Sequence, residues 1–101
     1  INRVSNVIQM AFAEIVSVTP GAFEGMDQIK RLNLAKNNLT ELNEGMFYGL
    51  ETCRNLVLYD NKINNISSFA FEGMYELSTL CLQNNLVDHL RSHTFSTIDL
   101  E

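Results

Sequence analysis

A repeat of about 24 residues runs through this chain of 101 residues and constrains its fold more than any other feature. Six columns of like residues recur at that spacing: Leu32/Leu56/Leu80, Leu34/Leu58/Leu82, Asn37/Asn61/Asn85, Leu39/Ile63/Val87, Leu42/Ile66/Leu90 and Phe23/Phe47/Phe71/Phe95. A unit this short cannot bury its apolar face alone, so neighbouring units stack into a solenoid. We expect about four turns, near residues 2–25, 26–49, 50–73 and 74–97.

Each repeat contains a short strand, because apolar and outward residues alternate in Leu32-Asn33-Leu34 and its equivalents. We expect strands near residues 7–9, 31–33, 55–57 and 79–81. Stacked in parallel, they line a concave face. The pattern predicts an α/β solenoid with irregular or short helical turns on the convex side.

Two columns have a specific physical role. The phenylalanines are expected to pack repeat on repeat as an aromatic spine. A buried asparagine carries both a carbonyl and an amide, so Asn37, Asn61 and Asn85 are expected to satisfy backbone groups where the chain turns away from the strands. Ala13 occupies this position in the first repeat, which predicts a looser or irregular first turn.

The stretch from Leu32 to Leu39, continued by Phe47-Tyr48-Gly49-Leu50, resembles a repeat of the extracellular "typical" leucine-rich-repeat class. The resemblance covers about residues 4–98 and is shared by Toll-like receptors, small leucine-rich proteoglycans and neuronal adhesion proteins. It implies a horseshoe that recognises proteins, glycans or lipids, usually on its concave face. Such families cap both ends with cysteine clusters, and neither end has one here. We therefore expect flanking repeats or caps from a longer parent chain.

The outward strand positions are the candidate contact surface for a protein or glycan ligand. Interfaces favour aromatic and arginine anchors within a polar rim, which places Tyr59 and Arg31 near the centre. The predicted contact residues are Phe12, Arg31, Asn33, Lys36, Asn55, Val57, Tyr59, Asp60 and Gln83. The alternative is that Val57 and Phe12 are ordinary strand formers on a wet sheet.

Charge and hydropathy narrow the classes of partner. A net charge of −5 with scattered basic residues predicts that neither a nucleic acid nor an anionic membrane is bound. No apolar run of about 18 residues occurs, so membrane insertion of this segment is not expected.

Cysteines and glycosylation sequons bear on where in or outside the cell the protein resides. Cys53 falls in an inward column and Cys81 on the outward side of a strand, which makes them poor disulfide partners. Asn38-Leu-Thr40 and Asn65-Ile-Ser67 are N-glycosylation sequons in expected turns. Both sequons are compatible with an extracellular or cell-surface protein.

No nucleotide-binding, nucleophile or metalloprotease motif occurs, so we expect neither an enzyme nor a cofactor. His89 and His93, with Asp88 beside them, lie in an expected loop and provide too few convergent ligands for a metal. The leading hypothesis is a ligand-recognition segment of an extracellular receptor of Toll-like or adhesion type. The alternatives are a secreted matrix or scaffold protein, and a non-catalytic repeat region attached to an enzyme.

Overall fold

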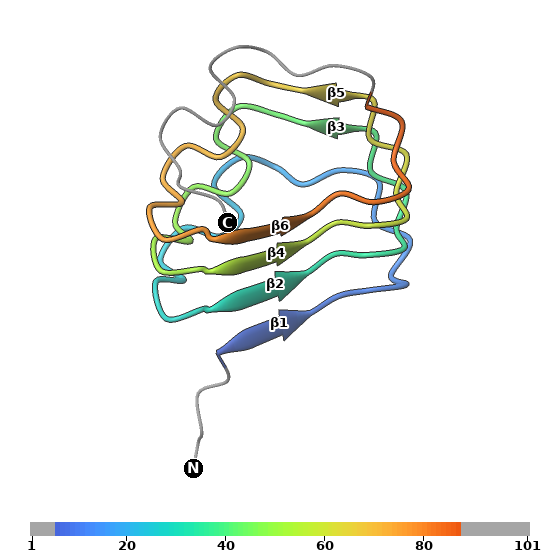
Figure 1. Cartoon of the computed structure of the whole chain (residues 1–101). Coiled ribbons are helices and arrows are strands. Elements are labelled where there is room, and N and C mark those ends of the chain that lie inside the picture. The colour runs from blue at the N-terminus through green and yellow to red at the C-terminus, as the bar shows by residue number, and fades with distance from the viewer. Residues whose placement is uncertain (1–5, 88–101) are drawn as a thin grey trace.

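Four parallel strands form one wall of the molecule in the computed structural model, which describes residues 6–87 (Figure 1). The strands are β1 (Val7–Gln9), β2 (Arg31–Asn33), β4 (Asn55–Val57) and β6 (Thr79–Cys81), and they pair in the order β1-β2-β4-β6. Leu32 lies opposite Ile8 on one side and Leu56 on the other, so neighbouring strands pair in a register of one whole repeat. The predicted strands and their parallel stacking are confirmed.

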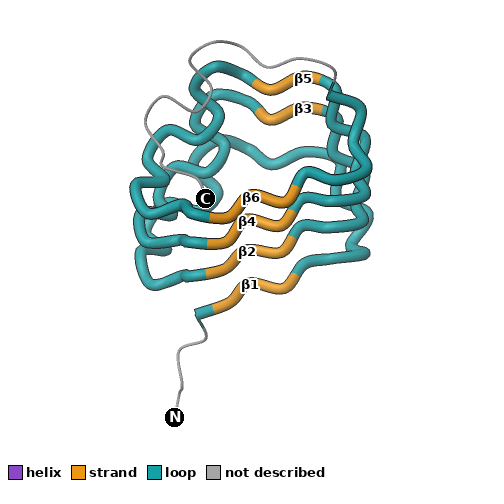
Figure 2. Tube along the Cα trace, in the orientation of Figure 1, coloured by secondary structure: helices purple, strands orange, loops and turns teal. Residues whose placement is uncertain are grey.

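A second, smaller sheet forms the opposite wall. It consists of β3 (Glu41–Leu42) and β5 (Asn65–Ile66), which pair in parallel with Leu42 opposite Ile66. Figure 2 shows that loops and turns make up the rest of the described chain. Of the expected irregular or short helical turns, residues 6–87 contain irregular, hydrogen-bonded turns and this small sheet but no helix. That part of the chain consequently has no helix that could span a membrane.

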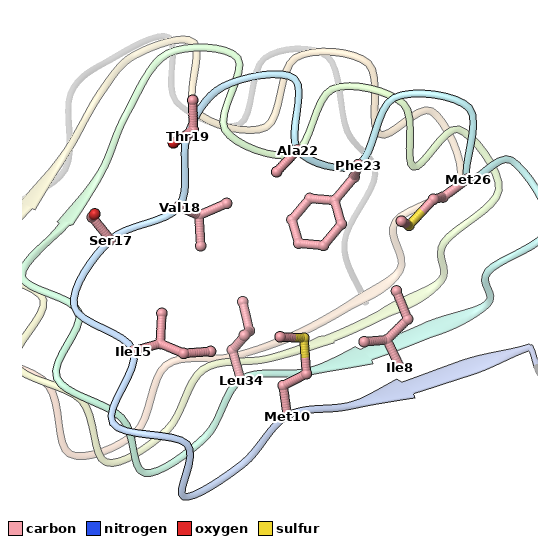
Figure 3. Close-up of a pocket in the computed structure, with 10 residues that line it drawn as sticks. All are labelled: Ile8, Met10, Ile15, Ser17, Val18, Thr19, Ala22, Phe23, Met26 and Leu34. Atoms are coloured by element: carbon pink, nitrogen blue, oxygen red, sulfur yellow. The ribbon is translucent and has the colours of Figure 1, made fainter.

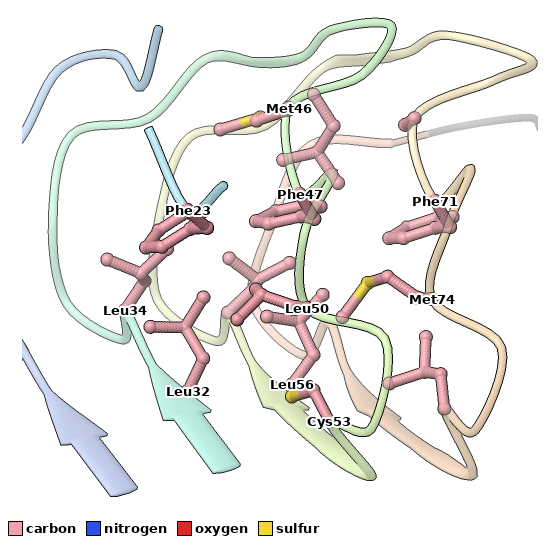
Figure 4. Close-up of a cluster of buried hydrophobic side chains, with 14 of the residues drawn as sticks. Phe23, Leu32, Leu34, Met46, Phe47, Leu50, Cys53, Leu56, Phe71 and Met74 are labelled. Carbon is pink, nitrogen blue, oxygen red and sulfur yellow. The ribbon is translucent and has the colours of Figure 1, made fainter. Parts of the chain in front are cut away.

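The core fills the space between the two walls. Leu32, Leu34, Leu56 and Leu58 point inward and are fully buried. Burying a side chain of this size contributes about 1.5–3 kcal/mol to stability. The rings of Phe23, Phe47 and Phe71 stack in a row, with centroids 6.3 and 6.0 Å apart and interplanar angles of 20° and 5° (Figure 4). The first three repeats therefore bury their aromatic rings against one another, and Phe95 lies outside the described residues.

The asparagine column joins each turn to the one before it. Asn61 Nδ2 donates to the carbonyls of Leu34 and Leu58 at 3.0 and 3.1 Å, and its Oδ1 accepts from the Leu39 amide at 3.0 Å. Asn37 and Asn85 make equivalent bonds. Buried backbone groups at the bend thus keep hydrogen-bond partners although they have left the sheet.

The first turn differs from the others. Glu14 has a φ of 60°, which its equivalents Asn38 and Lys62 do not share. The Ala13 amide donates to Asn37 Oδ1 of the next repeat at 2.9 Å, so the second repeat partly compensates for the missing asparagine. An apolar cavity of about 440 Å³ opens beside this turn (Figure 3). Its lining includes Ile8, Met10, Ile15, Val18 and Phe23, from the columns that fill the interior of later repeats. The cavity therefore lies at the first turn that the structure describes.

Candidate ligand-binding face

The residue three positions after each strand of the four-stranded sheet lies on one edge of that sheet, which we call the rim. Phe12, Lys36, Asp60 and Asn84 occupy this position in successive repeats, each with a φ of 59–60°. Residues other than glycine rarely adopt this left-handed conformation. Here it is held by the stack, because the Lys36 amide donates to the Tyr59 carbonyl at 2.9 Å and the Asp60 amide to the Gln83 carbonyl at 3.0 Å. The backbone thus lines up four side chains on one edge.

These side chains and Tyr59 form a connected group, which we call the rim cluster. Lys36 Nζ lies 3.0 Å from Asp60 Oδ2, and Asn84 Nδ2 donates to Asp60 Oδ1 at 2.8 Å. The same ammonium lies 5.3 Å from the ring centroid of Phe12 and 5.7 Å from that of Tyr59, within cation–π range. Residues from all four described repeats therefore meet in one charged and aromatic group.

Contacts within the rim cluster shift the pKa values of both its charged residues. The hydrogen bond to Asp60, reinforced by its charge, raises the pKa of Lys36 above its ordinary value. The hydrogen bonds from Lys36 and from Asn84 lower the pKa of Asp60. Both groups are consequently ionised at neutral pH, and the cluster presents both signs of charge.

The rim cluster is open to solvent. Phe12 is 74% exposed, and the side chains of Lys36 and Asp60 are 37% and 31% exposed. The folded core does not require an aromatic ring at such an exposed position. Aromatic rings are the kind of anchor that interfaces use.

Two of the predicted contact residues are buried instead. Asn33 is 9% and Val57 is 3% exposed. Both lie on the inner strands β2 and β4, where the strands on either side cover a short side chain. Asn33 Oδ1 also accepts the Ala35 amide at 2.9 Å, so its side chain serves the local backbone. The prediction that Asn33 and Val57 offer contact surface is therefore wrong.

The remaining predicted residues fall into two groups. Phe12, Lys36, Tyr59 and Asp60 lie together in the rim cluster, and the exposed Gln83 follows β6 beside it. Arg31 and Asn55 pair with each other at the first positions of β2 and β4, away from the rim. The cation beside Tyr59 is consequently Lys36 rather than Arg31. Asn84 is absent from the predicted set, although it lies one repeat after Asp60 and therefore on the same rim.

The other singled-out residues lie apart from the rim cluster. Asn38 is exposed after the first asparagine of the ladder, and Asn65 is exposed in β5. Burial raises the pKa of the Cys53 thiol, whereas Cys81 is partly exposed in β6, and both cysteines are free. Residues 6–87 contain no group of three or more potential metal ligands. Asp88, His89 and His93 lie outside the described residues.

The geometry is that of a repeat solenoid with an exposed charged and aromatic rim. A family model described as "Leucine rich repeat" matches residues 6–58 and 51–100, and the chain belongs to this family. No curated protein matches the chain.

One similar solved structure is described as "Crystal structure of TLR13-ssRNA13 complex". It superimposes with a TM-score of 0.87 and 26% sequence identity over 93% of this chain, and the match spans 14% of that chain. Fold and family together indicate a recognition module rather than an enzyme.

This comparison corrects the inference drawn from net charge. A protein with this fold is found in a complex with single-stranded RNA, so excluding a nucleic-acid partner is wrong. The net charge of −5 averages over the whole surface, whereas a ligand meets only one face. Arg31 and Lys36 lie on the sheet side of the molecule, where Asp60 is the acidic residue among the predicted contact positions.

Proposed function

We propose that this chain is a ligand-binding segment of an extracellular receptor and that the rim cluster contacts the ligand. The observation that carries the proposal is the exposed ring of Phe12 next to Lys36, which is itself held by Asp60 and lies near Tyr59. Four repeats contribute to the group, and neither of its rings belongs to the buried core. The similarity to a Toll-like receptor structure and the two exposed sequons support the receptor type and its extracellular location.

A protein is the ligand that fits the rim cluster best. Lys36 and Asp60 offer a cation and an anion side by side, which suits a surface with both kinds of polar group. The rings of Phe12 and Tyr59 add apolar area on either side of this pair. Aromatic residues are enriched in protein interfaces.

Single-stranded RNA is the second candidate, favoured by the RNA that the similar structure contains. Bases stack on aromatic rings and phosphates attract cations, and Phe12, Tyr59 and Lys36 provide these groups. Asp60 opposes this candidate because its carboxylate offsets the charge of Lys36.

The test is a comparison of four forms of the protein: wild type, Lys36→Ala, Tyr59→Ala and, as a control on the opposite wall, Glu41→Ala. Each is used to capture ligands from a display library of secreted proteins, and each is titrated with a labelled single-stranded RNA oligonucleotide. Removing a central anchor is expected to weaken binding by about 30-fold or more, while the control binds as wild type does. Equal binding by all four forms would place the contact elsewhere. RNA binding that vanishes at physiological salt would show non-specific attraction only.

A further inference from the structure

Three acidic segments carry the chain back toward the next strand. These return turns are residues 19–30, 43–54 and 67–78, and the second and third lie on the left in Figure 1, away from the ends of the strands that carry the rim cluster. They contain six carboxylates and two basic residues. The carboxylates, all exposed, belong to Glu24, Asp27, Glu44, Glu51, Glu72 and Glu76. Arg54 lies 3.6 Å from Glu76, so the excess negative charge rests on the other five.

Exposed aromatic rings stand among these carboxylates. Tyr48 is 48%, Phe69 is 53% and Tyr75 is 70% exposed. Tyr48 lies against Gly73, where its Cδ1 is 3.2 Å from the position that a Cβ would take, and Tyr75 follows shortly after this glycine. The Gly45 amide donates to the Phe69 carbonyl at 3.3 Å, which brings Phe69 to the turn that precedes Tyr48. The three aromatic residues thus occupy two adjoining return turns.

The core does not account for these rings. Phe47, next to Tyr48, and Phe71, between Phe69 and Tyr75, supply the stacked rings of the interior and are buried. The equivalents of Tyr48 in the two neighbouring repeats are Glu24 and Glu72. The equivalent of Tyr75 in the preceding repeat is Glu51, and Asp27 occupies the same position one repeat earlier still. Positions one repeat apart are neighbours in the stack, so each tyrosine shares its column with carboxylates.

We propose that Tyr48, Phe69 and Tyr75, with the surrounding carboxylates, form a second docking surface that takes a lysine- or arginine-rich segment of a protein partner. Charge complementarity carries this assignment. The face of an aromatic ring attracts a cation, and a nearby carboxylate can accept the hydrogen bonds of the same guanidinium. An anionic partner would meet repulsion here. The surface is separate from the rim cluster, so a receptor could hold its ligand and this partner together.

The probe is a fluorescein-labelled octapeptide of alternating arginine and glycine, titrated by fluorescence anisotropy at physiological salt. A peptide with glutamate in place of arginine serves as the probe control. The protein variants are Tyr75→Ala, Phe69→Ser and the double variant, with Glu41→Gln as the matched control for loss of one exposed carboxylate elsewhere. Circular dichroism of each variant establishes that it is folded. Tyr75 and Phe69 are both more than half exposed, so these substitutions leave the core intact.

The expected result is binding of the arginine peptide alone, weakened about 3-fold or more by each single substitution and further by the double variant. Glu41→Gln and the rim substitution Tyr59→Ala are expected to bind as wild type does. The proposal would be overturned if Tyr75→Ala and Phe69→Ser left binding of the arginine peptide unchanged while Glu41→Gln weakened it. Net charge alone would then explain the binding. No binding of the arginine peptide would overturn the proposal as well. Tyr59→Ala is predicted to weaken binding of the rim ligand only. Failure of the arginine peptide to bind would therefore not contradict the proposed function of the rim cluster.

Discussion

Lys36 Nζ and Asp60 Oδ2 lie 3.0 Å apart although the two residues belong to successive repeats, so the ion pair spans one full turn of the stack. Because Asn84 Nδ2 reaches the other oxygen of the same carboxylate, Asp60 links the second repeat to the fourth. The arrangement fixes the orientation of the charged groups on the rim without burying them.

The first prediction concerns the titration of this pair. The pKa of Asp60 is lowered from 3.8, so its contribution to stability is present above that value and is lost as the pH falls through the lowered pKa. The pKa of Lys36 is raised from 10.5, so its contribution is full below that value and is lost as the pH rises through the raised pKa. The pair is therefore expected to persist between pH 3.8 and pH 10.5 and to weaken only outside that window.

Carboxyl NMR provides the measurement. The midpoint for Asp60 is expected below 3.8 and should rise toward that value in Lys36→Ala, with a smaller rise in Asn84→Ala. A midpoint that stays the same in Lys36→Ala would show that the pair does not persist in solution.

The second prediction concerns the asparagine ladder. Asn61→Ala removes the bonds to the Leu34 and Leu58 carbonyls and to the Leu39 amide, and is expected to reduce the free energy of unfolding by about 1–3 kcal/mol. Urea denaturation measures the change. Asn64→Ala is the control, because Asn64 is exposed in the neighbouring turn. Equal effects of the two substitutions would mean that the buried hydrogen bonds of Asn61 contribute nothing to the free energy of unfolding.

The third prediction separates backbone strain from crowding at two glycines. Gly21 and Gly49 have φ values of 91° and 109°, so alanine is strained at both. A Cβ at position 21 meets nothing within 4 Å, whereas one at position 49 overlaps the Phe23 carbonyl oxygen and comes within 2.7 Å of Glu24 Cα. Gly21→Ala is expected to cost about 1–2 kcal/mol, from strain alone. Gly49→Ala is expected to cost about 3 kcal/mol or more. Similar melting temperatures for the two variants would contradict the close approach of the repeats at Gly49.

The fourth prediction tests the proposed extracellular setting. Asn38 and Asn65 are exposed, so both sequons are accessible to the glycosylation machinery of a secretory host. Asn38→Gln and Asn65→Gln are each expected to increase the gel mobility of the secreted protein by the equivalent of one glycan. After glycosidase treatment, the wild type and both variants should migrate at the same position. Secreted protein whose mobility is the same in all forms would count against these sites.

The periodic sequence was sufficient to predict the strands. Leucines one repeat apart take equivalent places in the stack, so Leu32, Leu56 and Leu80 locate three strands without further information. The second sheet was not predicted, because Glu41–Leu42 and Asn65–Ile66 are two residues long and too short to show an alternating pattern.

The candidate site was harder to predict than the fold. Alternation identifies which side of a strand faces outward, but exposure also depends on the neighbouring strands. Val57 faces outward in the pattern and is 3% exposed in the structure. The position of Lys36 over Tyr59 depends on a left-handed residue three places beyond the strand, which no alternation rule covers. The aromatic return turns lie outside the repeated leucine positions, so the repeat pattern gives no reason to single out Tyr75.

The direction of the asparagine bonds has a consequence for synthesis on the ribosome. Asn61 bonds back to Leu34 and Leu39, and Asn85 bonds back to Leu58 and Ile63. A turn's own asparagine already serves its bend, as Asn61 does for the Leu58 carbonyl, but the remaining partners come only after the following asparagine has been translated and has left the exit tunnel. Nascent turns would become complete one at a time, each about a repeat behind the growing end of the chain. A pause in translation just before an asparagine codon of this column would leave the preceding bend without these cross-turn bonds for as long as the pause lasts.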